Sequence, residues 1–438
     1  WYGSGDVVAT LTTGEDGTTG TSADLLPYGT YEIRESKAPE GYQLNDAWST
    51  TVEVREDGKV VGLGYAMSDP VTRGGVSVRK VDSERGTSDP QGDATLAGAQ
   101  FQITNDSTHD VVVDGTRFAP GEVVKTIATG EDGVAATTAD ALPYGSYTIR
   151  ETKAPEGYLL DSEWSQSFQV RAQGTVVDLT DDAHVVADQV IRGDVALRKV
   201  DAELDDSLPL GAATLAGAEV TVTNSSAHAV RVNGSERQPG EVVTTLVTDE
   251  AGEASTTGGA LPYGTYTLRE SKAPTGYLLN RDWSKTIQVR EDGVTVDVTD
   301  VANALPDQVK RADLRLVKAD EDSQDRMANV AFTLSSKSTG ESHVLVTDEN
   351  GMIDTSAAFN GREGGSVNAS DAAVSEDGTV DDSRLDAASG VWFSGRTDRE
   401  TTPTDSLGAL PYDTYELREL RCAANEGHRL VSMTVNVT

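Results

Sequence analysis

The chain has 438 residues, of which 25% are charged and 5% aromatic, and its formal net charge is −36 at pH 7. This negative charge argues against nucleic acid and against an anionic membrane as partners, because the long-range field repels both. The single cysteine, Cys422, excludes an intrachain disulfide, and no apolar run is long enough for a membrane-spanning helix.

One motif is repeated along the chain. Copies begin at Leu26, Leu142 and Leu261, and the middle one reads LPYGSYTIRETKAPEGY. A divergent fourth copy begins at Leu410. Lysines and aspartates elsewhere in the repeat recur at steps of 119 residues. The chain is therefore a tandem array, in which a function carried by one repeat is expected in several.

The repeat divides the chain into four modules of ordinary domain size. Alternating or β-branched segments such as YTIRE, SFQVR and TIQVR, separated by Asp-Gly and Asn-Gly turns, predict antiparallel β-sandwiches. The junctions VTRGGV, VIRGDV and VKRADL are short, so the modules are expected to stack as a semi-stiff rod. The predicted modules are 1–73, 74–192, 193–311 and 312–438.

The first and last modules depart from this pattern. The opening residues align with the middle of the third module, so the first module is expected to lack its N-terminal strand or strands. The fourth module is expected to stop before its last strand. It also carries an insertion, residues 360–395, that is rich in Gly, Ser and Asp. We interpret the insertion as an excursion without a core of its own, with a ligand-binding surface loop as the alternative.

Each full repeat places a lysine on its first strand, a glutamate on a middle strand and an aspartate on its last strand. If the core of a sandwich brings them together, burial favours the neutral amine and the neutral carboxylic acids. A neutral amine beside a protonated carboxyl group is a nucleophile facing an electrophile, so the predicted product is a Lys–Asp amide formed with loss of water. The spacing leaves open a buried ion cluster that does not react.

The motifs RKVD, LAGAQF, YTIRETKAPEGY and VVADQVIR of the second module, with their counterparts in the third, resemble a known family. It comprises the isopeptide-forming Cna protein B-type domains of Gram-positive surface adhesins and the related SpaA-type pilin domains. The resemblance covers nearly the whole chain. It implies an all-β rod of tandem immunoglobulin-like, prealbumin-like β-sandwich domains.

The resemblance also assigns roles to the recurring residues. It implies that the lysine before Val-Asp is the nucleophile and that the glutamate closing Tyr-x-x-x-Glu is the catalytic proton shuttle. It also implies that an Asn or Asp near the end of the last strand is the acceptor. The nucleophiles are then Lys80 and Lys199, the shuttles Glu151 and Glu270, and the acceptors Asp188 and Asp307. The end modules hold half-sites, with Glu35 and Asp69 in the first and Lys318 and Glu419 in the fourth.

The function that the resemblance implies is structural. The chain would form stalk or backbone repeats of an adhesin or pilus-like protein on the surface of a Gram-positive bacterium, outside the cell, stabilised by autocatalytic isopeptide bonds. It would reach the cell wall through segments outside this chain. No cofactor and no metal are expected.

Two other functions are weighed against this one. A ligand-binding array would bind a glycan or a host matrix protein through its loops, with the 360–395 insertion and an exposed Trp392 and Phe393 as the candidate surface; core packing is the favoured interpretation of that pair. An enzyme with a diffusible substrate is disfavoured, because the five histidines lack zinc-site spacing and no GxSxG, P-loop or dinucleotide motif occurs.

Overall fold

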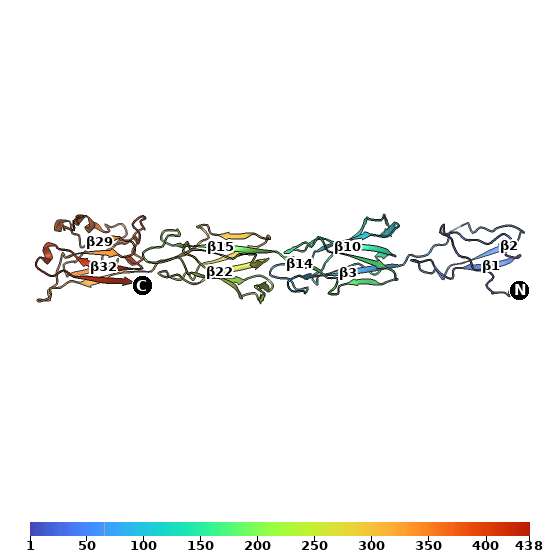
Figure 1. Cartoon of the computed structure of the whole chain (residues 1–438), viewed down its shortest axis with the longest axis horizontal. Coiled ribbons are helices and arrows are strands. Elements are labelled where there is room, and N and C mark those ends of the chain that lie inside the picture. Colours follow the sequence, from blue (N-terminus) through green and yellow to red (C-terminus); the bar gives the residue numbers. More distant parts are fainter. Residues whose placement is uncertain (65) are drawn as a thin grey trace. The chain divides into compact units, whose positions relative to one another are not determined.

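The computed structural model describes residues 1–64 and 66–438, and strands make up nearly all of its regular structure (Figure 1). Three short 3₁₀ helices are the only helical segments in these two ranges. The prediction of an all-β chain is therefore confirmed. In the described part of the chain, no helix is long and apolar enough to cross a membrane.

By compactness the chain divides into two units. The first unit holds residues 1–89 and 95–189, and the second holds residues 90–94 and 190–438. The finer division into four modules, with the bounds given above, remains a prediction.

The first module contains one small antiparallel sheet. Its two strands are β1 (Gly29–Arg34) and β2 (Ser49–Val54), and an isolated bridge joins Tyr42 to Val71. Large apolar side chains that precede β1, including Trp1 and Tyr28, are exposed. This module therefore leaves much of its apolar surface in contact with solvent.

The second module contains two sheets and a small hairpin. One sheet is antiparallel, in the order β12-β10-β4-β7, and the other is centred on β3. The strands are β3 (Arg73–Asp82), β4 (Gln100–Asn105), β5 (Val111–Val113), β6 (Thr116–Phe118), β7 (Val123–Ala128), β8 (Val134–Ala136), β9 (Leu142–Pro143), β10 (Gly145–Lys153), β11 (Tyr158–Leu159), β12 (Ser165–Val170), β13 (Val176–Leu179) and β14 (Val186–Val190).

Alternating apolar residues build the core between these sheets. Val76 and Val78 of β3 pack in one buried cluster with Phe101 of β4 and with Tyr147 and Ile149 of β10. Successive side chains of a strand point to opposite faces, so every second residue of each strand enters this core. β-branched and aromatic side chains suit such a half-buried surface. The core therefore fixes which residues of β3 and β10 point inward.

The predicted antiparallel sandwich is wrong in one respect. β14 runs parallel to β3, with Val186 opposite Lys80 and Asp188 opposite Asp82, and β13 is also parallel to β3. The chain enters β13 from β12, which belongs to the other sheet. A crossover of this kind allows two strands to run in the same direction. The first and last strands of the module are therefore neighbours.

The third module repeats this arrangement. Its antiparallel sheet has the order β19-β16-β22-β23, and β15 pairs in parallel with β24 and β25. The strands are β15 (Arg192–Asp201), β16 (Glu219–Asn224), β17 (Val230–Val232), β18 (Ser235–Arg237), β19 (Val242–Val247), β20 (Glu253–Ser255), β21 (Leu261–Pro262), β22 (Gly264–Lys272), β23 (Ser284–Val289), β24 (Thr295–Val298) and β25 (Leu305–Asp307).

The fourth module keeps the antiparallel sheet, in the order β29-β28-β32-β33, with two further strand pairs beside it. The strands are β26 (Arg311–Ala312), β27 (Arg315–Val317), β28 (Ala331–Ser336), β29 (Ser342–Val346), β30 (Met352–Asp354), β31 (Leu410–Pro411), β32 (Asp413–Glu419) and β33 (Ser432–Val437). The 3₁₀ helices are η1 (Ala369–Ala373), η2 (Asp382–Arg384) and η3 (Ala423–Asn425).

The 360–395 insertion, interpreted from the sequence as an excursion without a core of its own, is packed against the sheet of the fourth module. Its residues Val374, Val380, Leu385 and Ala387 pack against a small buried cluster on β28 and β29. The preferred interpretation of its aromatic pair is confirmed, because Trp392 is 2% exposed and Phe393 is fully buried. The insertion therefore extends the core of the fourth module, and these two rings offer no exposed surface to a ligand.

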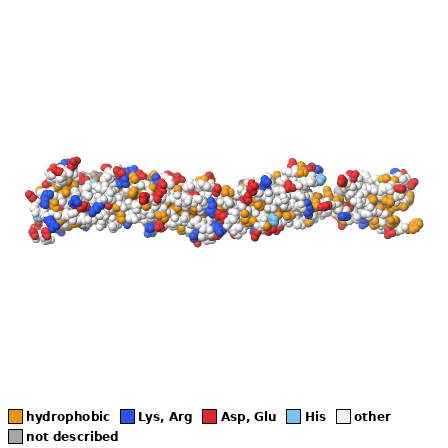
Figure 2. Space-filling model, viewed as in Figure 1, with side chains coloured by type: hydrophobic (Ala, Val, Ile, Leu, Met, Phe, Trp, Pro, Cys, Tyr) orange, Lys and Arg blue, Asp and Glu red, His pale blue; other side chains and the backbone are white. Residues whose placement is uncertain are grey.

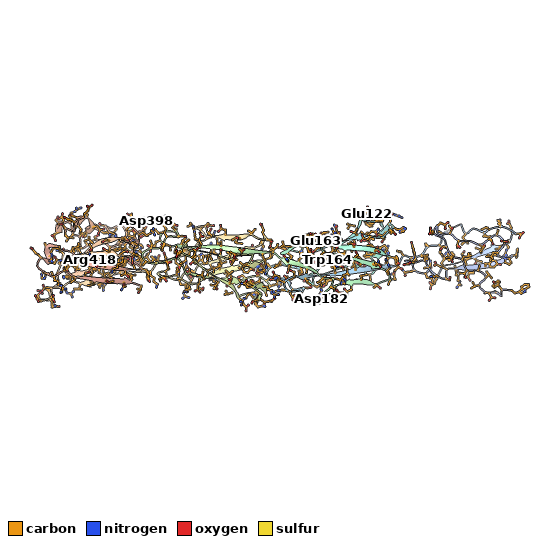
Figure 3. The ribbon with its side chains drawn as sticks, viewed as in Figure 1. Glu122, Glu163, Trp164, Asp182, Asp398 and Arg418 are labelled. Atoms are coloured by element: carbon orange, nitrogen blue, oxygen red, sulfur yellow. The ribbon has the colours of Figure 1, made fainter. Side chains whose placement is uncertain are left out.

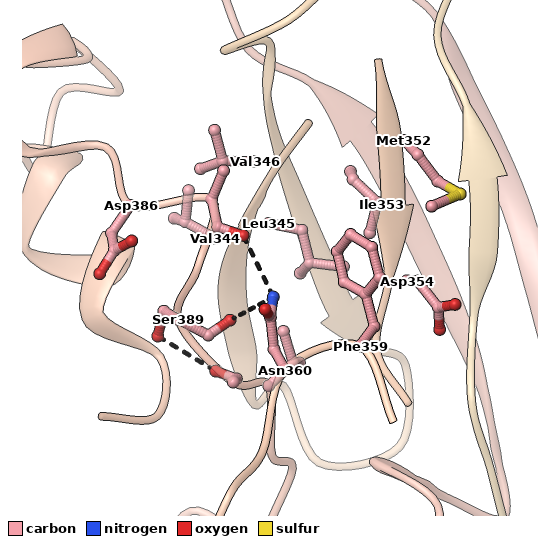
Figure 4. Close-up of a pocket in the computed structure, with 13 residues that line it drawn as sticks. Val344, Leu345, Val346, Met352, Ile353, Asp354, Phe359, Asn360, Asp386 and Ser389 are labelled. Atoms are coloured by element: carbon pink, nitrogen blue, oxygen red, sulfur yellow. Dashed lines mark hydrogen bonds between the residues drawn. The ribbon is translucent and has the colours of Figure 1, made fainter. Parts of the chain in front are cut away.

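A shallow pocket lies where the insertion meets β29 and β30 (Figure 4). Asn360 closes one side of it, donating from its side-chain amide to the carbonyls of Ala387 at 3.1 Å and Ser389 at 3.3 Å. Val344, Leu345 and other apolar residues line it together with Asp354 and Asp386. The pocket thus lies at the contact between the insertion and the sheet, and hydrogen bonds within the chain stabilise this contact.

On the face shown in Figure 2 the surface charge is dispersed. Figure 2 shows acidic side chains scattered along the visible face, with basic side chains among them, and no single patch of either sign. A strong net negative charge in this form favours solubility.

Candidate functional site

The structure brings together the three predicted residues of the second module. Lys80 lies on β3, Glu151 on β10 and Asp188 on β14, and all three side chains are fully buried. Nζ of Lys80 lies 2.7 Å from Oε2 of Glu151 and 2.5 Å from Oδ1 of Asp188. Lys80 shares the inward phase of Val76 and Val78, so the strand pattern that builds the core also points the amine into it.

The third module holds the same triad. Nζ of Lys199, on β15, lies 2.6 Å from Oδ2 of Asp307, on β25, and 3.5 Å from Oε1 of Glu270, on β22. The Lys199–Asp307 approach is close but lacks hydrogen-bond geometry, since neither Nζ nor either Asp307 oxygen has a hydrogen-bond partner among the described residues. A buried amine and carboxyl group in this relation are in contact without the hydrogen bonds that stabilise an ion pair.

Three carboxyl groups of the two triads, those of Glu151, Asp188 and Asp307, hold protons more tightly than usual. Burial raises the pKa of Glu151 to about 7, against the attraction of Lys80 and with a further contribution from the neighbouring Asp188. Burial also raises the pKa of Asp188, and it raises the pKa of Asp307 to about 7. In each module at least one carboxyl group can therefore hold a proton near neutral pH.

The half-sites of the end modules are also brought together. In the first module, burial and the neighbouring Asp69 carboxyl raise the pKa of Glu35. In the fourth module, Nζ of Lys318 lies 3.0 Å from Oε2 of Glu419. Oε1 of Glu419 also accepts a hydrogen bond from the Asn425 side chain at 2.9 Å. Each end module thus keeps two members of the triad in contact.

Sequence reasoning missed a buried pair that supports each triad. The hydroxyl of Tyr158 donates to Oδ2 of Asp82 at 2.9 Å, and the hydroxyl of Tyr277 donates to Oδ2 of Asp201 at 2.8 Å. Both aspartates are fully buried, and burial raises the pKa of Asp201 to about 6. The signal was present in the repeat, because each aspartate closes RKVD and each tyrosine ends the KAPEGY or KAPTGY motif.

A family comparison identifies most of the chain. The model of the SpaA prealbumin-like fold domain matches residues 2–64, 74–183 and 193–303, which is more than half of the chain. The chain belongs to this SpaA family. The predicted class of tandem prealbumin-like domains is therefore confirmed. The second and third SpaA matches end just before Asp188 and Asp307.

Solved structures resemble this SpaA-family chain at low sequence identity. The Bacillus anthracis TIE protein is 20% identical with a TM-score of 0.48, and the match covers 89% of this chain and 53% of that one. The major pilin subunit BcpA of Bacillus cereus is 16% identical with a TM-score of 0.28, covering 84% and 96% of the two chains. The shaft pilin SpaA of Lactobacillus rhamnosus GG is 17% identical with a TM-score of 0.21, covering 55% and 98%.

The chain thus spans about half the length of the TIE protein structure that it matches. No curated protein sequence matches it. In the two described ranges, no group of three or more His, Cys, Asp or Glu side chains is arranged to hold a metal ion.

Outside the SpaA matches, His343 of the fourth module ties the insertion to β29. Its Nδ1 lies 2.7 Å from Oδ2 of Asp371 and its Nε2 lies 3.1 Å from Oε1 of Glu341, while its ring packs edge-on against Phe393. Burial lowers the pKa of His343, but hydrogen bonds and attraction to the two carboxylates outweigh burial and raise it to about 9. The imidazolium therefore bridges two acidic groups at neutral pH.

This bridge predicts a loss of stability in alkaline solution. The folded-state pKa of His343 lies above its ordinary 6.5, so the stabilisation is fully present below pH 6.5 and is lost as pH rises through about 9. The loss is at most about 3 kcal/mol. Hydrogen exchange of peptides from β28 and β29, corrected for the intrinsic effect of pH, measures it. H343Q should remove the dependence, and an equal pH response in H343Q and wild type would contradict it.

Proposed function

We propose that this chain is a structural segment of an extracellular stalk or pilus-like shaft on a Gram-positive cell wall. In this proposal, its second and third modules each close one autocatalytic Lys–Asp isopeptide bond. Membership of the SpaA family supports the structural role. Attachment to the wall is made by segments outside this chain.

One observation is the main support for the proposed Lys–Asp isopeptide bond. In two modules a fully buried lysine amine lies within 2.6 Å of an aspartate oxygen, beside a buried glutamate. The carboxyl pKa values, raised by burial, supply the protonated acid that the reaction needs. The reacting groups are already in contact inside a packed core. The reaction therefore avoids the loss of translational and rotational entropy that two separate molecules would undergo.

The reaction balances within each triad. Nζ of neutral Lys80 attacks Cγ of protonated Asp188, so that an N–C bond forms and one C–O bond breaks. Glu151 takes a proton from the nitrogen and passes one to the departing hydroxyl, which leaves as water. Glu151 ends in the protonation state in which it began. Each module reacts once, so the chain consumes its own side chains and is not an enzyme.

The intact mass of the purified chain under denaturing conditions tests this function. We expect the mass to fall short of the sequence mass by two waters, and a digest to contain peptides joining Lys80 to Asp188 and Lys199 to Asp307. The full sequence mass would mean that each triad is only a buried ion cluster. A deficit of one water would confine the reaction to the module whose linked peptide is found.

A further inference from the structure

A loop of constant spacing contacts a carboxyl group of the site in each of the first three modules, and the proposed reaction does not yet give this loop a role. It begins at a tyrosine, has an Asn or Asp three residues later and reaches a tryptophan after three more. The Asn or Asp always lies ten residues beyond the glutamate of its module. The three loops are Tyr42–Asn45–Trp48, Tyr158–Asp161–Trp164 and Tyr277–Asn280–Trp283.

In the second module the loop aims a backbone N–H at the acceptor. The N–H of Asp161 donates to Oδ1 of Asp188 at 3.3 Å, which is the same oxygen that Nζ of Lys80 approaches at 2.5 Å. The other acceptor oxygen, Oδ2, has no hydrogen-bond partner among the described residues. The two oxygens of the acceptor are therefore distinguished before any reaction takes place.

The loop is held at both ends. Tyr158 is fixed by its hydrogen bond to the buried Asp82, and the Trp164 ring packs edge-on against Phe101 with centroids 5.7 Å apart. Between them, Asp161 starts a turn in which its side chain accepts from the N–H of Glu163 at 3.1 Å. The N–H that faces Asp188 is thus presented by a preorganised turn.

The third module presents the equivalent N–H to the shuttle. The N–H of Asn280 donates to Oε2 of Glu270 at 2.8 Å, and Oε1, which has no hydrogen-bond partner among the described residues, is the oxygen nearer Lys199. The Asn280 side-chain amide donates at 2.7 Å to the carbonyl of Pro306, the residue before the acceptor. In the first module Asn45 makes the same two contacts, to Glu35 and Ser68, at 3.4 Å.

We propose that the backbone N–H of this loop is a catalytic donor that orients a carboxyl group at each site, and that Asp161 supplies the oxyanion donor of the second module. This inference rests on the isopeptide function proposed above. When the bond from Nζ to Cγ forms, negative charge develops on the oxygen that stays. The N–H of Asp161 stabilises that charge on Oδ1, while Oδ2 takes the proton from Glu151 and leaves as water.

Two proline substitutions at neighbouring positions test the effect of this N–H. D161P removes the hydrogen-bond donor, whereas S162P places proline at the next position of the same turn, where proline is favoured and where Ser162 is exposed. The full chain is made in a cell-free reaction, quenched at intervals and digested, and the Lys80–Asp188 peptide is quantified against the Lys199–Asp307 peptide of the same molecules. We expect D161P to slow the second-module bond at least about tenfold relative to S162P, because one oxyanion donor contributes about 100-fold or more at full strength.

The outcomes separate this inference from the function on which it rests. A wild-type chain that forms neither bond overturns the proposed function. A wild-type chain that forms both, with D161P as fast as S162P, overturns only the role of the Asp161 N–H. If D161P fails to fold, replacing the amide of residue 161 by an ester removes the donor and keeps the aspartate side chain. We expect the same slowing from the ester, and a wild-type rate would overturn the inference.

Discussion

Replacing Glu151 by glutamine is expected to abolish the Lys80–Asp188 bond and to lower the melting temperature of the second module by about 20 °C. Glutamine cannot take the proton from Nζ or pass one to the departing hydroxyl. Without the bond, the 108-residue loop between Lys80 and Asp188 is no longer closed. In the chain-entropy model such a closure stabilises by about 4–5 kcal/mol, which corresponds to a shift of this size. Calorimetry and intact mass measure the two effects.

Two further variants make this result specific. E163Q changes an exposed glutamate on the same module, and both the bond and the melting temperature should match those of the wild type (Figure 3). D188N should still form the amide, because the side-chain amide loses ammonia where the acid loses water, and its final mass should equal that of the wild-type product. If E151Q still formed the bond, Glu151 would not be the shuttle.

The triads could be predicted from the sequence because their signal is local and repeated. Lys80 and Asp188 each sit in a β-branched strand at a position in phase with buried valines, and the same positions recur in the third module. The direction of β14 could not be predicted in this way. An alternation of period two is the same for parallel and antiparallel strands, so the pattern gives the buried face but not the partner.

The packing of the insertion and the position of the loop N–H could not be predicted, for different reasons. The Gly-, Ser- and Asp-rich composition of residues 360–395 is typical of exposed loops. Its burial depends on distant partners, such as Arg311, whose guanidinium lies 3.9 Å from the centre of the Trp392 ring. The N–H of Asp161 has no sequence signature of its own, since every residue except proline carries one. Its importance comes only from where the turn points it.

The proposed covalent path through the chain predicts how the chain responds to force. In the second module β3 enters and β14 leaves as parallel neighbours, with Asp82 opposite Asp188. Tension applied to the ends of the module would shear this ladder of hydrogen bonds if nothing else joined the strands. With the bond in place, tension passes from Lys80 directly to Asp188, and residues 81–187 carry none of it. From Asp188 only a short stretch of chain leads to Lys199 and the next bond.

Single-molecule stretching of the wild-type chain should therefore show no extension step from the second or third module. E151Q should restore one step, of about 350 Å, because the 108 residues released span at most about 3.3–3.6 Å each. The third module of the same molecule, with its own bond intact, is the internal control and should give no extension step. Wild-type steps of this length from both modules would contradict the covalent path. An E151Q chain without this extension step would show that hydrogen bonds alone hold β3 and β14 together at the applied force.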